Sequence, residues 1–92
     1  MEKIEFIIPC YNNKYQLKNI LYSLLNQSNP NWIAHVISDG EWVEYDDFKI
    51  DFERENLFED KIKFSLIEGP NKDWGHTARN YGLEHATQDW IV

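Results

Sequence analysis

The sequence has 92 residues and one cysteine, and its 16 acidic side chains outnumber the 9 basic ones, which gives a net charge of −7. A chain this short forms one small domain with a marginal core, and its acidic balance argues against sequence-independent binding to nucleic acid. One cysteine excludes an internal disulfide and a cysteine-based zinc site. The longest apolar run, residues 6–8, is too short to span a bilayer, and residues 1–3 lead directly into a strand-like segment without a signal peptide. We therefore expect a cytoplasmic protein with no membrane span and no nucleic-acid partner.

Most of the negative charge lies in residues 39–60. Ten acids and two bases give this segment a charge of −8, so the other 70 residues together carry +1. A solvated surface segment explains the pattern. The alternative is a metal site, because hard cations bind oxygen ligands, but the acids lack the spacing of a calcium-binding loop. The apolar anchors of this segment, which we expect in a loop or short helix, are Trp42, Tyr45, Phe48, Phe52 and Phe58.

The first half of the chain is typical of a strand, a helix and a second strand. Residues 4–8 predict a mostly buried strand that Pro9 stops. Asn12 and Asn13 offer helix caps, with Gln16 three residues after Asn13 in a capping-box-like arrangement. Apolar residues then recur at the spacing of one helix face, which predicts a helix over residues 14–27. The residues of that face are Leu17, Ile20, Leu21, Leu24 and Leu25.

The remaining elements follow in the same order. A second strand is predicted over residues 32–38, ending at Asp39-Gly40. The alternation of Ile62, Phe64 and Leu66 predicts a third strand over residues 61–67. A turn at residues 68–71 separates this strand from a helix over about residues 75–86, and a fourth strand begins at residue 89. Strand–helix–strand, repeated, predicts an α/β fold with a mainly parallel sheet.

Three polar turns should meet at one edge of this sheet, because ligands of parallel α/β sheets bind outside the carboxyl ends of the strands. The turns are residues 9–12, 38–41 and 69–71. The sequence contains no glycine fingerprint for a dinucleotide, no P-loop and no nucleophile elbow. His35, His76 and His85 lie too far apart for a helical metal pair, so we interpret each as a surface or packing residue.

Four sequence blocks give this edge a specific interpretation. They are Phe6-Ile7-Ile8-Pro9-Cys10-Tyr11-Asn12, Ser23-Leu24-Leu25-Asn26-Gln27, Ile37-Ser38-Asp39-Gly40 and Ala78-Arg79-Asn80-Tyr81-Gly82-Leu83-Glu84-His85-Ala86. Together they resemble the N-terminal half of an inverting GT-A glycosyltransferase of family 2, over the whole chain. The resemblance implies a Rossmann-like GT-A half-domain over residues 1–92, truncated in the fourth strand. It further implies a nucleotide-sugar donor, most often a UDP-sugar, a divalent metal (Mn or Mg), and a glycan or other hydroxyl acceptor.

The resemblance also implies which residues bind the nucleotide. They are Pro9, Tyr11, Asn12, Asp39, Gly40 and Arg79. Pro9, Tyr11 and Asn12 would line the base and ribose, and the Asp39 carboxylate would accept a hydrogen bond from the uracil N–H. Arg79 would contact the base or the pyrophosphate with its charged donor fork.

Other roles for these residues remain open. Tyr11 could cap the first helix, Asp39 could be a turn residue before Gly40, and Arg79 could pair with the acidic segment. The family motif usually has a second acid where this sequence has Ser38, which leaves the ribose contact open. Asn80 and Gly82 are interpreted as structural, through a helix-to-strand hydrogen bond and close packing. The role of residues 73–76 is left open.

The resemblance places the Asp-x-Asp metal motif and the catalytic base beyond Val92. We therefore expect that the chain alone has no metal ligands, transfers no sugar and self-associates through its open fourth strand. Two alternatives are a nucleotide-binding module without turnover and an interaction scaffold. Retention of Tyr11, Asp39 and Arg79 argues against the scaffold.

Overall fold

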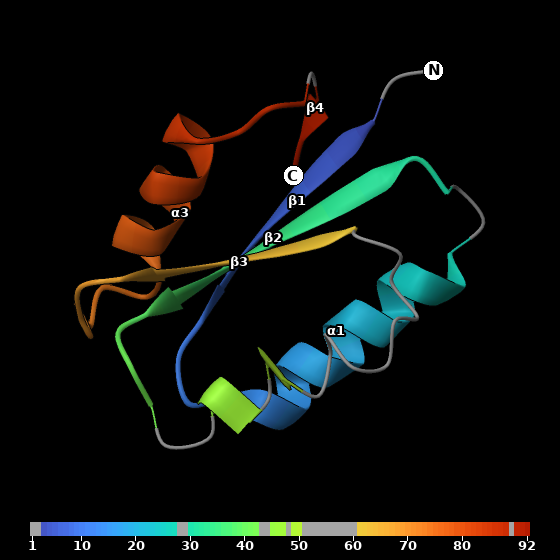
Figure 1. Ribbon diagram of the computed structural model, residues 1–92. Helices are drawn as coiled ribbons and strands as arrows, with labels where there is room; N and C mark the ends of the chain where they lie inside the picture. The colour runs from blue at the N-terminus through green and yellow to red at the C-terminus, as the bar shows by residue number, and fades with distance from the viewer. Residues whose placement is uncertain (1–2, 28–29, 43–44, 48, 51–60, 89) are drawn as a thin grey trace.

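The computed structural model describes residues 3–27, 30–42, 45–47, 49–50, 61–88 and 90–92. Its centre is a four-stranded sheet in the order β3-β2-β1-β4, in which every pair is parallel. The strands are β1 (Ile4–Cys10), β2 (Trp32–Asp39), β3 (Ile62–Ile67) and β4 (Trp90–Ile91). Helix α1 (Lys14–Asn26) lies on one face of the sheet and helix α3 (His76–Glu84) on the other (Figure 1). The predicted α/β fold is confirmed, with an all-parallel sheet.

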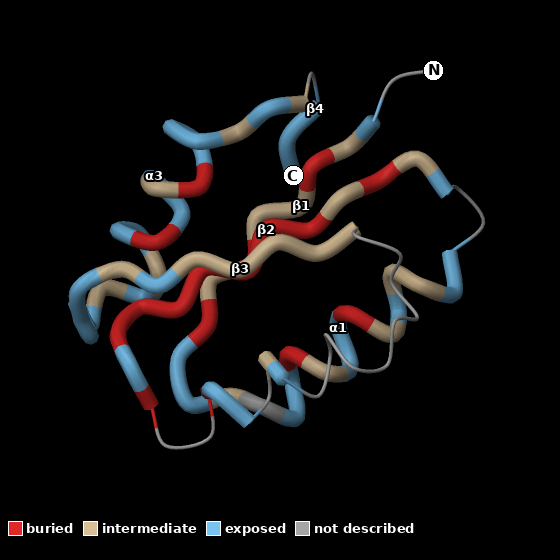
Figure 2. Tube along the Cα trace, in the orientation of Figure 1, coloured by how far each residue is buried: buried red, intermediate tan, exposed pale blue. Residues whose placement is uncertain are grey.

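The main core lies between the sheet and α1. Alternate residues of β1 and β2 face this side, where they meet Leu17 and Leu21, both fully buried (Figure 2). Of the predicted apolar helix face, Leu24 and Leu25 pack partly against the core, whereas Ile20 is exposed. The strand residues of this core are Ile8, Cys10, Trp32, Ala34 and Val36.

The other face of the sheet carries a polar cluster beside α3. The carboxylate of Glu5 is fully buried, and its Oε1 accepts hydrogen bonds from Thr87 N at 3.0 Å and Thr87 Oγ1 at 3.3 Å. Its Oε2 lies 3.6 Å from Lys63 Nζ and 3.9 Å from His35 Nδ1. His35 is hydrogen-bonded through Nε2 to Ser65 Oγ at 2.7 Å, which confirms it as a packing residue. Burial and then Lys63 lower the pKa of His35, whereas Glu5 opposes the shift.

The prediction that Pro9 ends the first strand is wrong. Strand β1 continues through Pro9 to Cys10, and Pro9 is in register with Ile37 of β2. Glu5 O and Ile7 N bond Val92, so odd-numbered residues of β1 direct their backbone groups towards β4. At Pro9 no strand lies on that side among the described residues, so its missing N–H breaks no ladder hydrogen bond.

The predicted capping box at the start of α1 is also wrong. Asn13 is the N-cap residue, but its side chain makes no hydrogen bond to the helix. Its Oδ1 accepts the backbone N–H of Tyr11 instead, at 3.0 Å. An Asn side chain that bonds the preceding loop is no longer free for the helix N-terminus. Asn13 therefore fixes the β1–α1 turn, in which Asn12 has a positive φ of 51°.

The other boundaries fall within one or two residues of the prediction. In the acidic segment, residues 45–47 and 49–50 are helical, and Trp42 and Tyr45 are buried as expected. Phe48, Phe52 and Phe58 lie outside the described residues. Leu66, the last of the alternating apolar residues that predicted the third strand, is exposed on the edge strand β3. In the described part of the chain, no helix combines the length and apolar character needed to cross a membrane.

Strand β4 forms the other edge of the sheet. Trp90, Ile91 and Val92 are all exposed, beside the start of β1. An exposed apolar edge is compatible with self-association, which stays a prediction. His76 and His85 are exposed, in accord with their interpretation as surface residues.

Gly82 allows α3 to approach the sheet closely, as predicted. An added Cβ would lie 2.5 Å from Ile7 Cγ2 and 2.7 Å from Ile37 Cδ1. The branched methyl of Ile7 has little room to rotate away. By contrast, Asn80 is exposed, and its predicted hydrogen bond to a strand is not found among the described residues.

We expect Gly82→Ala to destabilise the protein despite the better helix propensity of alanine. Overpacking costs about 1–3 kcal/mol, against a propensity gain of about 1 kcal/mol. Urea unfolding checks this, with Leu83→Ala on the exposed side of α3 as the control. A higher urea midpoint for Gly82→Ala than for wild type would contradict the close packing of α3.

Candidate functional site

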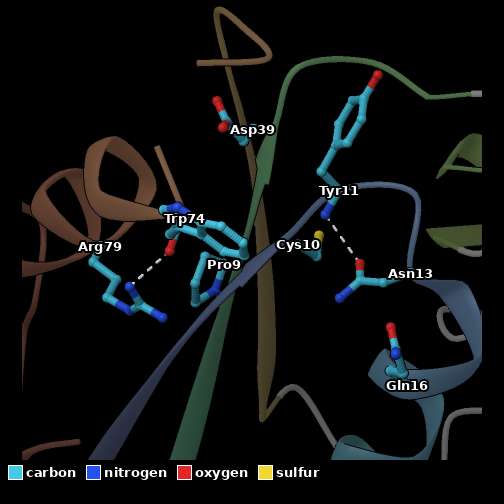
Figure 3. Close-up of a pocket in the computed structure, with 9 residues that line it drawn as sticks. Pro9, Cys10, Tyr11, Asn13, Gln16, Asp39, Trp74 and Arg79 are labelled. Carbon is cyan, nitrogen blue, oxygen red and sulfur yellow. Dashed lines mark hydrogen bonds between the residues drawn. The ribbon is translucent and has the colours of Figure 1, made fainter. Parts of the chain in front are cut away.

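A cavity of about 500 Å³ opens at the carboxyl ends of the two central strands. It lies where β1 leads to α1 on one face of the sheet and α3 begins on the other, a location where parallel α/β sheets bind ligands. Figure 3 shows its walls. The lining residues are Pro9, Cys10, Tyr11, Asn13, Gln16, Asp39, Trp74, Gly75 and Arg79.

The structure brings four of the six predicted nucleotide residues to this cavity. They are Pro9, Tyr11, Asp39 and Arg79. Asn12 lines a neighbouring hollow with Tyr11, and Gly40 lines another beside the end of β3. Cys10, Asn13, Gln16, Trp74 and Gly75 also line the cavity but were not assigned to it from the sequence. Two of these, Trp74 and Gly75, belong to residues 73–76, whose role the sequence left open.

Asp39 is the buried carboxylate of the cavity. It is 6% exposed at the end of β2, and the turn after β3 holds it in place. Asn71 donates its backbone N–H to both carboxylate oxygens, at 3.2 and 3.1 Å, and its side-chain amide to Oδ1 at 2.6 Å. A carboxylate has about four lone-pair sites, so Oδ2 can accept a further donor. The convergence of the β2 and β3 turns is thereby confirmed.

Ser38, in the place of the usual second acid, hydrogen-bonds within the turn after β2 and does not line the cavity. It is fully buried, donates to Gly40 O at 2.6 Å and accepts from Trp42 Nε1 at 3.0 Å. Both hydroxyl functions are therefore used within the protein. Cys10 is similarly unreactive, because burial raises the pKa of its thiol to about 12 and outweighs the opposing hydrogen bond with Ser38.

The loop before α3 forms the other wall of the cavity. Gly75, at φ 84°, passes so close to Pro9 that an added Cβ would lie 3.2 Å from its ring. Arg79, one turn into α3, donates from Nη1 to Trp74 O at 2.9 Å. Its guanidinium is exposed, and within the described ranges it forms no ion pair, so its other donors can meet a ligand.

Asp73 fixes the approach to α3. Its Oδ2 accepts hydrogen bonds from the backbone and the hydroxyl of Thr77. The hydroxyl hydrogen bond, the larger cause, lowers the pKa of Asp73. Asp73 therefore stays ionised at neutral pH and holds the loop that carries Trp74 and Arg79.

The donor set does not fit a divalent metal. Across the parts of the chain that the structure describes, no three His, Cys, Asp or Glu side chains are grouped to hold an ion. Asp39, the carboxylate that lines the cavity, is bonded to Asn71. The metal implied by the resemblance stays a prediction, and no chemical step is assigned to one.

A parallel α/β sheet with helices on both faces and a polar and aromatic cavity at its carboxyl edge defines a protein of the Rossmann-like fold class. Comparison with known families specifies the class further. The profile of glycosyl transferase family 2 matches residues 5–92, so the chain belongs to this family. A comparison with curated protein sequences found no significant match.

Proposed function

We propose that the cavity binds the UDP part of a nucleotide-sugar, in an enzyme that transfers the sugar to an acceptor hydroxyl. The family membership supports sugar transfer in general. The observation that carries the proposal is the meeting of Tyr11, Asp39 and Arg79 in one cavity, although they come from distant parts of the sequence. These side chains supply an aromatic face, an anionic acceptor and a cationic donor.

Asp39 would recognise the base. Its Oδ2 retains acceptor capacity beside the hydrogen bonds from Asn71, and the uracil imide N–H is a suitable donor. A hydrogen bond to an ionised carboxylate is roughly twice as strong as one between neutral groups. A cytosine ring presents no N–H at the equivalent position, so this contact favours uracil over cytosine.

Arg79 would bind the anionic part of the ligand. A guanidinium offers a rigid fork of donors that suits phosphate oxygens, and one hydrogen bond to Trp74 O already orients that of Arg79. A diphosphate has several oxygens that match the remaining donors. Tyr11, 43% exposed, presents an aromatic ring that can pack beside the base.

Calorimetric titration with UDP tests the proposal, because it measures binding without requiring turnover. We expect Asp39→Asn to weaken UDP binding by about 1.5–3 kcal/mol, or roughly 10- to 150-fold. Asp47→Asn is the matched control, since it removes the same charge from an exposed position. The preference for UDP over CDP should fall in the Asp39 variant.

A second variant separates recognition by Asp39 from its hold on the turn. Asn71→Ala removes the side-chain amide donor to Asp39 but keeps the backbone N–H donor, and it leaves the carboxylate in the cavity. We expect this variant to retain most of the preference for UDP over CDP. Absence of UDP binding by the wild-type chain would overturn the proposed function, and equal losses of preference in the two variants would remove Asp39 from direct base contact.

A further inference from the structure

Trp74 lies at the cavity but contributes almost nothing to the core. Its side chain is 92% exposed, the highest exposure among the described large apolar residues, and it lines the cavity together with Tyr11. In Figure 3 the Trp74 indole and the Tyr11 ring lie on opposite sides of the strand ends, and the Asp39 carboxylate lies above the indole. An indole in this position gains little free energy from burial, so packing within the protein does not explain why a tryptophan is found here.

The backbone holds Trp74 in a conformation that tryptophan disfavours. Its φ of 59° lies in the left-handed region, where a non-glycine residue is unfavourable. Two contacts define the loop around it: Arg79 Nη1 donates to the Trp74 carbonyl at 2.9 Å, and Gly75 lies against Pro9. Disfavoured backbone conformations persist where surrounding contacts determine them, and they cluster at ligand sites.

We propose that Trp74 is a second aromatic wall of the site, which stacks on the base of the bound nucleotide while Tyr11 packs on it from the other side. This inference rests on the proposed function and deepens it. A nucleobase is flat and apolar on both faces but polar at its edge. The cavity offers matching groups, since two aromatic side chains and the Asp39 acceptor all line it.

The two kinds of contact make different contributions. Stacking on an aromatic side chain strengthens binding of every base, because every base has a π-face. The carboxylate discriminates among bases through its acceptor. Trp74 therefore determines how tightly nucleotides bind, and Asp39 determines which nucleotide is preferred.

Four variants and three ligands test the role of Trp74. Trp74→Asn removes the ring and introduces a residue that tolerates the left-handed conformation. Trp74→Phe keeps an aromatic face. Trp90→Phe and Tyr15→Asn are controls, since both change exposed aromatic residues that do not line the cavity. Uridine, UMP and UDP are titrated by calorimetry.

We expect Trp74→Asn to weaken uridine, UMP and UDP by the same factor, roughly 5- to 150-fold. Trp74→Phe should recover most of the affinity. The thermal midpoint of Trp74→Asn should equal or exceed that of wild type, whereas the loss of a residue with a structural role would lower the midpoint. Nucleotide should also quench tryptophan fluorescence in wild type and Trp90→Phe, with the quenching lost in Trp74→Phe.

The outcomes separate this inference from the proposed function. If wild type and Trp74→Asn bind UDP equally, the second wall is overturned and the proposed function stands. A loss confined to UDP, with uridine and UMP unaffected, would assign the indole to the diphosphate end of the ligand and overturn base stacking. If Trp74→Asn fails to fold, the fluorescence of Trp74→Phe still tests the inference. Nucleotide that quenches tryptophan fluorescence in Trp74→Phe as it does in wild type would overturn the role of Trp74. A wild-type chain that binds no UDP overturns both proposals.

Discussion

Gly40→Ala is expected to destabilise the protein by roughly 2–5 kcal/mol, the sum of a left-handed backbone penalty and an overpacking cost. Gly40 has a φ of 92°, and an added Cβ would lie 2.5 Å from the Gly69 carbonyl carbon and 2.8 Å from Pro70 N. These are backbone atoms, so no side-chain rotation relieves the contact. The turn after β3 must move, and Asn71, which bonds Asp39, belongs to that turn.

Urea unfolding and UDP titration measure the two consequences of Gly40→Ala. Gly75→Ala is the matched control, because Gly75 also has a positive φ but its added Cβ would meet side-chain atoms only, the Pro9 ring at 3.2 Å and Arg79 Nη1 at 3.6 Å, among the nearest atoms. The difference between the two variants therefore isolates the backbone clash. We expect Gly40→Ala to lower the urea midpoint more than Gly75→Ala. Equal midpoints would show that the turns of β2 and β3 can separate freely.

The helices and strands were predictable from the sequence because each has a clear period of apolar residues or a clear boundary. The leucine spacing gave α1 and the polar turns gave the edge of the sheet, and both rules depend only on neighbours along the chain. Pro9 and Asn13 were misread because their roles depend on distant partners. Among the described residues no strand pairs with Pro9 on the side of β4, so Pro9 is tolerated there, and Asn13 bonds the preceding loop instead of the helix.

The candidate site was predicted in the same uneven way. Asp39 could be placed because it ends a parallel strand, and the carboxyl ends of parallel strands converge. Arg79 was placed only through the resemblance to the family. The hold of Asn71 on Asp39 could not be predicted, because the two residues are 32 positions apart. The participation of Trp74 depends on a left-handed backbone that no local pattern indicates. Long-range contacts and unusual backbone conformations are thus what the sequence left open.

Removal of the buried Glu5 carboxylate should have the other large effect. Glu5→Ala is expected to cost about 2–4 kcal/mol, because it leaves the Thr87 N–H without its acceptor and uncovers a space beside His35. The expected loss of stability is smaller than for a fully buried ion pair, because Lys63 is 38% exposed and solvent screens its charge. Thr87 lies in the connection between α3 and β4, so loss of its anchor should loosen the β4 edge first.

Glu5→Gln separates the hydrogen bonds from the charge. Glutamine retains a carbonyl oxygen for Thr87 but carries no charge for Lys63, so we expect about half the loss measured for Glu5→Ala. Urea unfolding gives both values. Equal losses would show that charge, not the Thr87 hydrogen bonds, dominates this cluster.

The position of Glu5 also predicts what should not change. Glu5 lies four residues before Pro9 in β1, a distance of about 13 Å along a strand, so it is at the end of the strand remote from the cavity. Folded Glu5→Ala should therefore bind UDP with wild-type affinity at a temperature well below its unfolding midpoint. A parallel loss of stability and affinity would mean that the polar cluster beside α3 also positions Arg79, and the separation of stability from binding along β1 would be wrong.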